Sequence, residues 1–122
     1  MKILKSYNVQ IWVGLGQHYN PDTIVHPEVV RSLCQTWTDD VKDCVTVTPT
    51  EFIYAGGNEP GVVVGLIQYP RFEMQESDIL DRAIALATIL MHSLDQFRVT
   101  ITTPTESFML ENTELILKHD KK

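Results

Sequence analysis

Two stretches of the chain carry apolar residues at helical spacing. The first follows Pro27, which suits the opening turn of a helix because its missing N–H has no intrahelical partner there. Its apolar positions recur at intervals of three and four and are Val30, Leu33, Cys34, Trp37 and Val41. The second begins after Ser77 and Asp78, which suit a helix N-terminus, and its apolar stripe runs to Leu94. Both patterns predict amphipathic helices that bury one face.

Around these stretches lie segments rich in Val, Ile, Thr and aromatic residues, a composition typical of strands. They are residues 7–16, 44–54, 61–69 and 98–103, with 107–110 as a further candidate. The junction at residues 55–60, Ala-Gly-Gly-Asn-Glu-Pro, predicts a turn. Glycine adopts positive φ angles without steric strain, and Pro60 has no N–H to donate to the hydrogen bonds between strands.

The chain also contains an internal repeat. The segment Val13-Gly14-Leu15-Gly16-Gln17 returns as Val64-Gly65-Leu66-Ile67-Gln68, and the Val-Thr-rich segment at 45–51 returns at 99–106 in the same order. A helical pattern lies between the paired segments in each half, so each half reads β-α-β. We therefore predict an α+β fold with a four-stranded ferredoxin-like sheet and two helices on one face.

This arrangement sets the expected domain organisation. We expect one domain over residues 1–110, made of two β-α-β repeats at about 7–54 and 61–110, and a C-terminal tail over 111–122. Alternate residues of a strand point to opposite faces, so the apolar residues of the strands cannot all face the helices, and some apolar area stays on the uncovered side; these residues are Trp12, Val47, Val62, Val64 and Ile101. We therefore expect a homo-oligomer, with a trimer favoured over a dimer.

Composition and charge narrow the function classes. The chain has 122 residues, 43% of them hydrophobic, and a formal net charge of −6. This acidity argues against nucleic acid, which is bound through clustered Lys and Arg. No apolar run approaches the roughly 20 residues of a transmembrane helix, so we expect no membrane partner. With no secretory signal pattern and only two cysteines, Cys34 and Cys44, we expect a cytoplasmic protein without a disulfide framework.

The segment Phe52-Ile53-Tyr54-Ala55-Gly56-Gly57-Asn58-Glu59-Pro60, followed by an apolar strand and the second helix, resembles the macrophage migration inhibitory factor branch of the tautomerase superfamily. The start Cys44-Val45-Thr46 is also similar to a strand of the CutA-like trimers. Both resemblances imply a trimer with clefts between subunits. Tautomerase chemistry uses an N-terminal proline as base, and this chain starts Met1-Lys2-Ile3. The resemblance therefore implies a member without the catalytic amine.

The loops that follow the two repeated strands carry the candidate site. If they converge on one cleft, six residues line a pocket for a small polar ligand: Gln17, His18, Tyr19, Gln68, Tyr69 and Arg71. Arg71 would supply a planar fork of donors and the tyrosines a stacking surface. The alternative is that the Gln and Tyr pairs are remnants of duplication that cap the sheet ends.

Other chemistry-bearing residues give weaker patterns. Glu51 and Glu106 occupy equivalent repeat positions, either as a carboxylate pair or as solvated turn residues. Asp39, Asp40 and Asp43 lack the ligand spacing of an EF-hand, and the four histidines have no ligand spacing. We expect no metal and no cofactor. The sequence thus favours a ligand- or partner-binding protein that is not an enzyme, with a cofactor-independent acid–base enzyme and a structural assembly subunit as alternatives.

Overall fold

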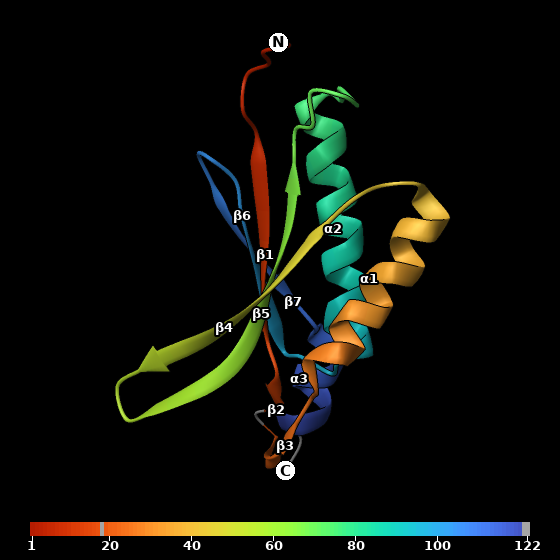
Figure 1. Cartoon of the computed structure of the whole chain (residues 1–122). Helices are drawn as coiled ribbons and strands as arrows, with labels where there is room; N and C mark the ends of the chain where they lie inside the picture. Colours follow the sequence, from red (N-terminus) through yellow and green to blue (C-terminus); the bar gives the residue numbers. More distant parts are fainter. Residues whose placement is uncertain (18, 121–122) are drawn as a thin grey trace.

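The structure, a computed structural model, describes residues 1–17 and 19–120 and has an α+β fold (Figure 1). Its elements, in chain order, are β1 (Asn8–Gly14), β2 (Gly16–Gln17), β3 (Asn20–Ile24), α1 (Pro27–Val41), β4 (Thr46–Tyr54), β5 (Gly57–Ile67), α2 (Glu76–Ser93), β6 (Arg98–Thr102), β7 (Ser107–Glu111) and α3 (Thr113–Asp120). The main sheet has the order β4-β5-β1-β6-β7, and every neighbouring pair is antiparallel. The predicted four-stranded sheet is wrong, because β7 extends it to five strands.

Helices α1 and α2 lie on the same side of the sheet (Figure 1). Helix α1 begins at Pro27, where the sequence predicts a start, and the ring of His26 accepts a hydrogen bond from the N–H of Glu28 at 3.1 Å. Helix α1 ends at Val41 and is capped by Lys42, whose φ of 60° is left-handed. The helices cover a core built by alternate residues of the central strands and by one face of each helix; among its fully buried members are Val9, Ile11, Val13, Val30, Val62, Val64, Leu86, Leu90 and Ile101.

The opposite side of the sheet carries no helix, and we call it the open face. Successive residues of a strand point to opposite sides, so the neighbours of the buried residues belong to this face. The cross-strand register places Trp12 of β1 between Val63 on β5 and Thr100 on β6. Residues assigned to the open face by this alternation include Gln10, Trp12, Gly14, Phe52, Glu59, Gly61, Arg98, Thr100, Met109 and Glu111.

Strands β4 and β5 form a long hairpin that extends past the end of β1 (Figure 1). The predicted turn at 55–60 is shorter than expected, because residues 57–60 already belong to β5. Pro60 is accommodated since the nitrogen and oxygen of one residue point to the same side of a strand. The oxygen of Pro60 accepts a hydrogen bond from the N–H of Leu15 at 2.9 Å, so the nitrogen of Pro60 also points toward Leu15 and away from β4. The hydrogen bonds between β5 and β4 therefore do not need an N–H from Pro60.

The C-terminal segment predicted as a tail contains a helix, α3. It lies beside the short β2–β3 hairpin, where the rings of Tyr19 and His119 stack at 4.3 Å and both approach Phe97. The division of the chain at residue 110 and the cytoplasmic location stay predictions. Within the described residues, no helix has the length and apolarity needed to cross a membrane.

Candidate functional site

The structure places the predicted site residues in two groups. Gln17 and Tyr19 follow β1, whereas Gln68, Tyr69 and Arg71 follow β5. Because β1 and β5 run antiparallel, the segments that follow them lie at opposite ends of the sheet. One copy of the chain therefore does not bring these residues into one cleft. His18 lies outside the described residues, and a ligand-binding role for the six stays a prediction.

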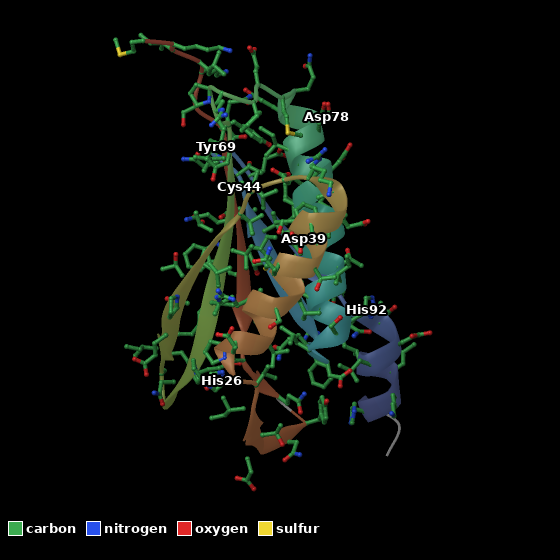
Figure 2. The ribbon with its side chains drawn as sticks, turned by 45° about the vertical axis from the view of Figure 1, so that its right-hand side comes forward. His26, Asp39, Cys44, Tyr69, Asp78 and His92 are labelled. Atoms are coloured by element: carbon green, nitrogen blue, oxygen red, sulfur yellow. The ribbon has the colours of Figure 1, made fainter. Side chains whose placement is uncertain are left out.

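Several of these side chains have contacts within the fold. The amide of Gln17 donates to the carbonyl of Leu94 at 3.3 Å, and burial raises the pKa of Tyr19, with nearby Asp95 adding to the effect. At the other end, the thiol of Cys44 donates to the hydroxyl oxygen of Tyr69 at 3.4 Å, and the two residues lie side by side in Figure 2. This hydrogen bond, together with burial, raises the pKa of Tyr69 to about 12.

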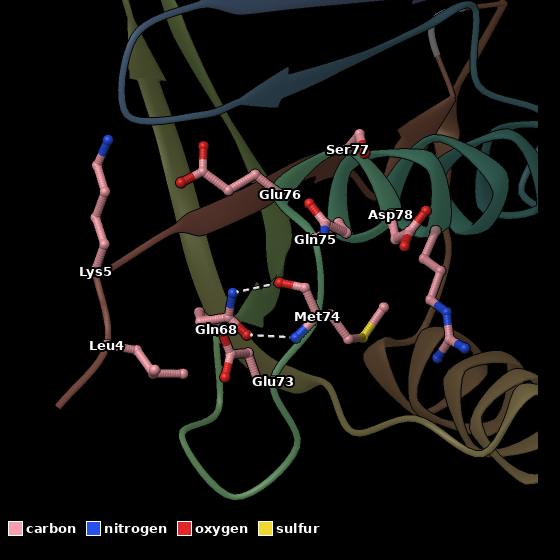
Figure 3. Close-up of a pocket in the computed structure, with 10 residues that line it drawn as sticks. Leu4, Lys5, Gln68, Glu73, Met74, Gln75, Glu76, Ser77 and Asp78 are labelled. Atoms are coloured by element: carbon pink, nitrogen blue, oxygen red, sulfur yellow. Dashed lines mark hydrogen bonds between the residues drawn. The ribbon is translucent and has the colours of Figure 1, made fainter. Parts of the chain in front are cut away.

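A large cavity of about 890 Å³ opens beside Gln68 (Figure 3). The side chain of Gln68 bonds both backbone groups of Met74, at 2.6 and 2.9 Å, and so closes the loop that leads into α2. The lining is polar, with carboxylates from Glu73, Glu76 and Asp78. None of its ten lining residues is aromatic, so the cavity offers no flat surface on which a ring could stack.

A second cavity, of about 540 Å³, lies between α1 and β4 and is lined by both cysteines of the chain. Cys44 is exposed, whereas Cys34 is only 3% exposed, and burial raises the pKa of its thiol from 9.0 to about 11. A neutral thiol of this kind is a poor nucleophile and a poor metal ligand. No cluster of three His, Cys, Asp or Glu residues that could hold a metal ion is found among the described residues.

The open face holds a more distinctive group of side chains. Glu59 is opposite Phe52 on the β4–β5 hairpin, and its Oε2 accepts a hydrogen bond from the N–H of Gly16 at 2.8 Å. The carboxylate lies directly over Gly14, where an added Cβ would stand 2.5 Å from the same oxygen. Glycine at this position therefore makes room for the carboxylate on the sheet.

The Gly16 peptide is held from its other side as well. Gln96, which is 3% exposed, donates from its amide to the oxygen of Gly16 at 3.0 Å. Glu59 and Gln96 thus fix the N–H and the carbonyl of Gly16, the first residue of β2. These hydrogen bonds hold Gly16 from two sides, and its N–H in turn positions the half-buried carboxylate of Glu59.

Trp12 and Arg98 complete this group. The indole Nε1 of Trp12 donates to the hydroxyl of Thr102 at 2.9 Å, which fixes the orientation of the ring. Arg98 lies at the start of β6, and its Nε donates to Glu111 at 3.3 Å. Residues of β1, β4, β5 and β6, together with Gln96, line a cavity of about 180 Å³; they are Trp12, Gly14, Phe52, Glu59, Gln96, Arg98 and Thr100.

This open-face cavity combines three kinds of recognition. Aromatic rings bind flat or cationic groups, a carboxylate binds a cation, and a guanidinium binds a carboxylate. Sequence reasoning did not select Trp12, Glu59 or Arg98 as site residues. The alternation of residues along β1 places Trp12 on the uncovered face, and this signal could have identified it from the sequence. The proximity of Glu59 and Arg98 depends on the pairing of four strands, which the sequence does not show.

No protein-family model matches the sequence, and no curated protein matches it. Two solved structures share its fold with a TM-score of 0.72. One is described as phage SAM lyase in complex with S-methyl-5′-thioadenosine; it is 16% identical, and the match covers 91% of this chain and 95% of that one. The other is phage SAM lyase in the apo state, 17% identical, with coverage of 91% and 94%. At this identity the likeness shows the fold.

These matches correct several predictions. The resemblance to the tautomerase superfamily and to the CutA-like trimers is wrong, because the chain shares its fold over nearly its whole length with a different class of protein. The short Gly-Gly-Asn-Glu-Pro motif that suggested it forms the tip of a hairpin, which many folds contain. The predicted tautomerase-like binding protein without enzyme activity is contradicted by the same matches, both of which are lyases. The trimer implied by the two families loses its basis, and the oligomeric state stays a prediction.

Proposed function

We propose that this protein is an enzyme that cleaves S-adenosylmethionine (SAM) and releases S-methyl-5′-thioadenosine. The observation that carries the proposal is the shared fold, over 91% of the chain, with a SAM lyase in complex with that thioether. A small-molecule ligand is in keeping with the same match. The open-face cavity supplies groups of the chemical types that such a ligand needs.

The bond that breaks follows from the two molecules. The sulfonium of SAM carries three carbons, and S-methyl-5′-thioadenosine keeps the methyl and the 5′ carbon. The third bond, to the γ carbon of the amino-acid arm, breaks, and its electron pair stays on sulfur, which becomes a neutral thioether. The γ carbon then bonds to the carboxylate of its own arm to give a lactone, or its neighbour loses a proton to give an alkene. Either route balances without water or an oxidant.

The open-face residues have separate roles in this proposal. The cavity of about 180 Å³ is smaller than the roughly 300–1,000 Å³ of a typical ligand pocket, so it takes the amino-acid arm. The ring of Trp12 faces the nucleoside and the sulfonium, a cation that aromatic faces attract. Glu59, held by the N–H of Gly16, faces the ammonium group of the arm.

The test is to incubate the purified protein with SAM and to separate the products by reversed-phase chromatography with mass detection. We expect S-methyl-5′-thioadenosine to form well above the rate in a protein-free sample, together with a four-carbon amino-acid fragment. Formation of S-adenosylhomocysteine instead would indicate methyl transfer, and unchanged SAM would indicate no activity on it. Either result would overturn the proposal.

A further inference from the structure

Arg98 and Glu111 form a cross-strand ion pair at the edge of the open-face cavity. The two residues are directly opposite in the β6–β7 register, and Nε of Arg98 lies 3.3 Å from Oε2 of Glu111. Both side chains are about half exposed, at 51% and 44%. A pair this open to water is weak, because water and salt screen the two charges. Glu111 therefore leaves Arg98 available for exchange with another anion.

The guanidinium of Arg98 has N–H donors that its contact with Glu111 does not use. Arginine carries five N–H donors in a planar fork, and the contact with Glu111 uses the one on Nε. Over residues 1–17 and 19–120, the structure shows no other hydrogen bond or ion pair of Arg98. The two terminal nitrogens can thus meet a carboxylate with two parallel hydrogen bonds, a geometry that lysine does not offer.

The charges around the cavity select the kind of ligand. Its lining holds one cationic side chain, Arg98, and one carboxylate, Glu59, with Glu111 just outside. A ligand with a carboxylate and an ammonium on one carbon has a partner for each group. We infer that Arg98 binds the carboxylate of the ligand's amino-acid arm, and that Glu111 weakens this binding by competing for the same guanidinium. The inference rests on the proposed function, since that function names a ligand with such an arm.

The experiment uses two thioethers that differ in the arm. S-adenosylhomocysteine carries the amino-acid arm on a neutral sulfur, and S-methyl-5′-thioadenosine has a methyl group in its place. Calorimetric titration of the wild-type protein with each compound isolates the contribution of the arm. Neither compound is a sulfonium, so binding is measured without cleavage.

We expect Arg98→Gln to raise the Kd for S-adenosylhomocysteine about tenfold and to change the Kd for S-methyl-5′-thioadenosine less than twofold. Arg98→Lys should fall in between, because it keeps the charge and loses the fork. Glu111→Gln should lower the Kd for S-adenosylhomocysteine two- to fivefold and leave the other compound unaffected. Arg31→Gln and Glu28→Gln are matched controls, since these residues form a similar exposed pair at 3.4 Å on α1.

The outcomes separate this inference from the proposed function. Circular dichroism checks that each variant is folded. Equal effects of Arg98→Gln on both compounds, no effect on either, or absence of binding to the wild-type protein would overturn the inference. If the wild-type protein shows the expected preference and leaves SAM intact, Arg98 keeps its role in binding the arm and the proposed cleavage fails.

Discussion

The carboxylate of Glu59 accepts a hydrogen bond from the N–H of Gly16 at 2.8 Å, although the two residues are 43 positions apart. The contact joins the β4–β5 hairpin to the start of β2. It leaves the carboxylate over the bare backbone of Gly14, beside the cavity of the open face. This one contact therefore links the fold of the hairpin to the proposed chemistry.

Replacing Glu59 with glutamine tests that link. The amide oxygen of Glu59→Gln can still accept from Gly16, so we expect the free energy of unfolding to fall by only about 1 kcal/mol. The negative charge that faces the ligand's ammonium is lost, so kcat/KM for SAM should fall at least tenfold, mainly through KM. Urea unfolding and steady-state kinetics measure the two effects.

The control for this variant is Glu51→Gln. Glu51 lies on the same hairpin and accepts a hydrogen bond from Asn58, but it does not line the open-face cavity. We expect its kcat/KM to stay within twofold of the wild-type value. Equal loss of activity in both variants would show that the hairpin as a whole, rather than the carboxylate of Glu59, matters.

Two glycine substitutions separate folding from site geometry. In Gly61→Ala the new Cβ would stand 2.7 Å from the backbone oxygen of Val13 and would overlap the Phe52 ring. The backbone of Val13 is held in the sheet and cannot move away easily, so we expect a loss of about 2–3 kcal/mol in the free energy of unfolding. In Gly14→Ala the Cβ meets only the carboxylate end of Glu59, which can turn aside by giving up its bond to Gly16, so stability should fall by only about 1 kcal/mol while SAM cleavage drops. Full activity of Gly14→Ala would contradict the proposed position of the carboxylate.

Trp12 and Phe52 are the aromatic residues that line the open-face cavity. Stacking of a base on an aromatic ring contributes about 1–3 kcal/mol. Trp12→Leu should therefore raise the Kd for S-methyl-5′-thioadenosine about tenfold in calorimetric titration. Thr102→Val is the control, because it removes the acceptor of the indole N–H and leaves the ring in place; we expect less than a threefold change. Wild-type affinity in Trp12→Leu would place the nucleoside elsewhere.

The two cysteines should differ in reactivity. Cys44 is exposed and should react within minutes with a thiol reagent in the folded protein. Cys34 is buried and its pKa is raised to about 11, so it should react only after unfolding in urea. Mass spectrometry of the labelled protein counts the modified thiols. Rapid labelling of two thiols in the folded protein would contradict the buried position of Cys34.

The raised pKa of Cys34 also predicts a pH dependence of stability. Below about pH 9 the thiol is neutral in both the folded and the unfolded chain, so its full contribution is present. Between about pH 9 and pH 11 the unfolded chain loses the proton while the folded chain keeps it, and stability falls by on the order of 2 kcal/mol. Cys34→Ala should show a shallower fall over this range in urea unfolding. Parallel curves for the two proteins would contradict the shifted pKa.

The main elements could be predicted from local patterns. The apolar stripe from Ile79 to Leu94 and the opening proline of α1 identified the two large helices. A composition rich in Val, Ile, Thr and aromatic residues identified four strands, and the further candidate at 107–110 corresponds to β7. The β2–β3 hairpin and α3 were missed, since Gly16–Gln17 is too short for a pattern and α3 has polar residues around a short apolar run. The predicted turn extends too far, to Pro60, although β5 already begins at Gly57. Pro60 fits in the strand because its nitrogen points toward β1, and the sequence alone does not show that orientation.

The candidate site was less accessible to sequence reasoning. Loops at matching ends of the two repeats were expected to meet, and the antiparallel pairing of β1 with β5 separates them. The cavity instead depends on side chains from β1, β4, β5 and β6 at one register. That register comes from long-range strand pairing, so neither Glu59 nor Arg98 stood out as a site residue in the chain.

The most direct test follows the methyl group of SAM during the reaction. SAM labelled with ¹³C at the methyl carbon is mixed with the wild-type protein and, separately, with Glu59→Gln, and ¹³C NMR spectra are collected over time. The predicted result is that the sulfonium methyl signal is replaced by the thioether methyl signal of S-methyl-5′-thioadenosine, at least tenfold faster with the wild-type protein than with the variant at subsaturating SAM. A sulfonium signal that decays no faster than in buffer, or equal rates in the two proteins, would contradict SAM cleavage at the open face.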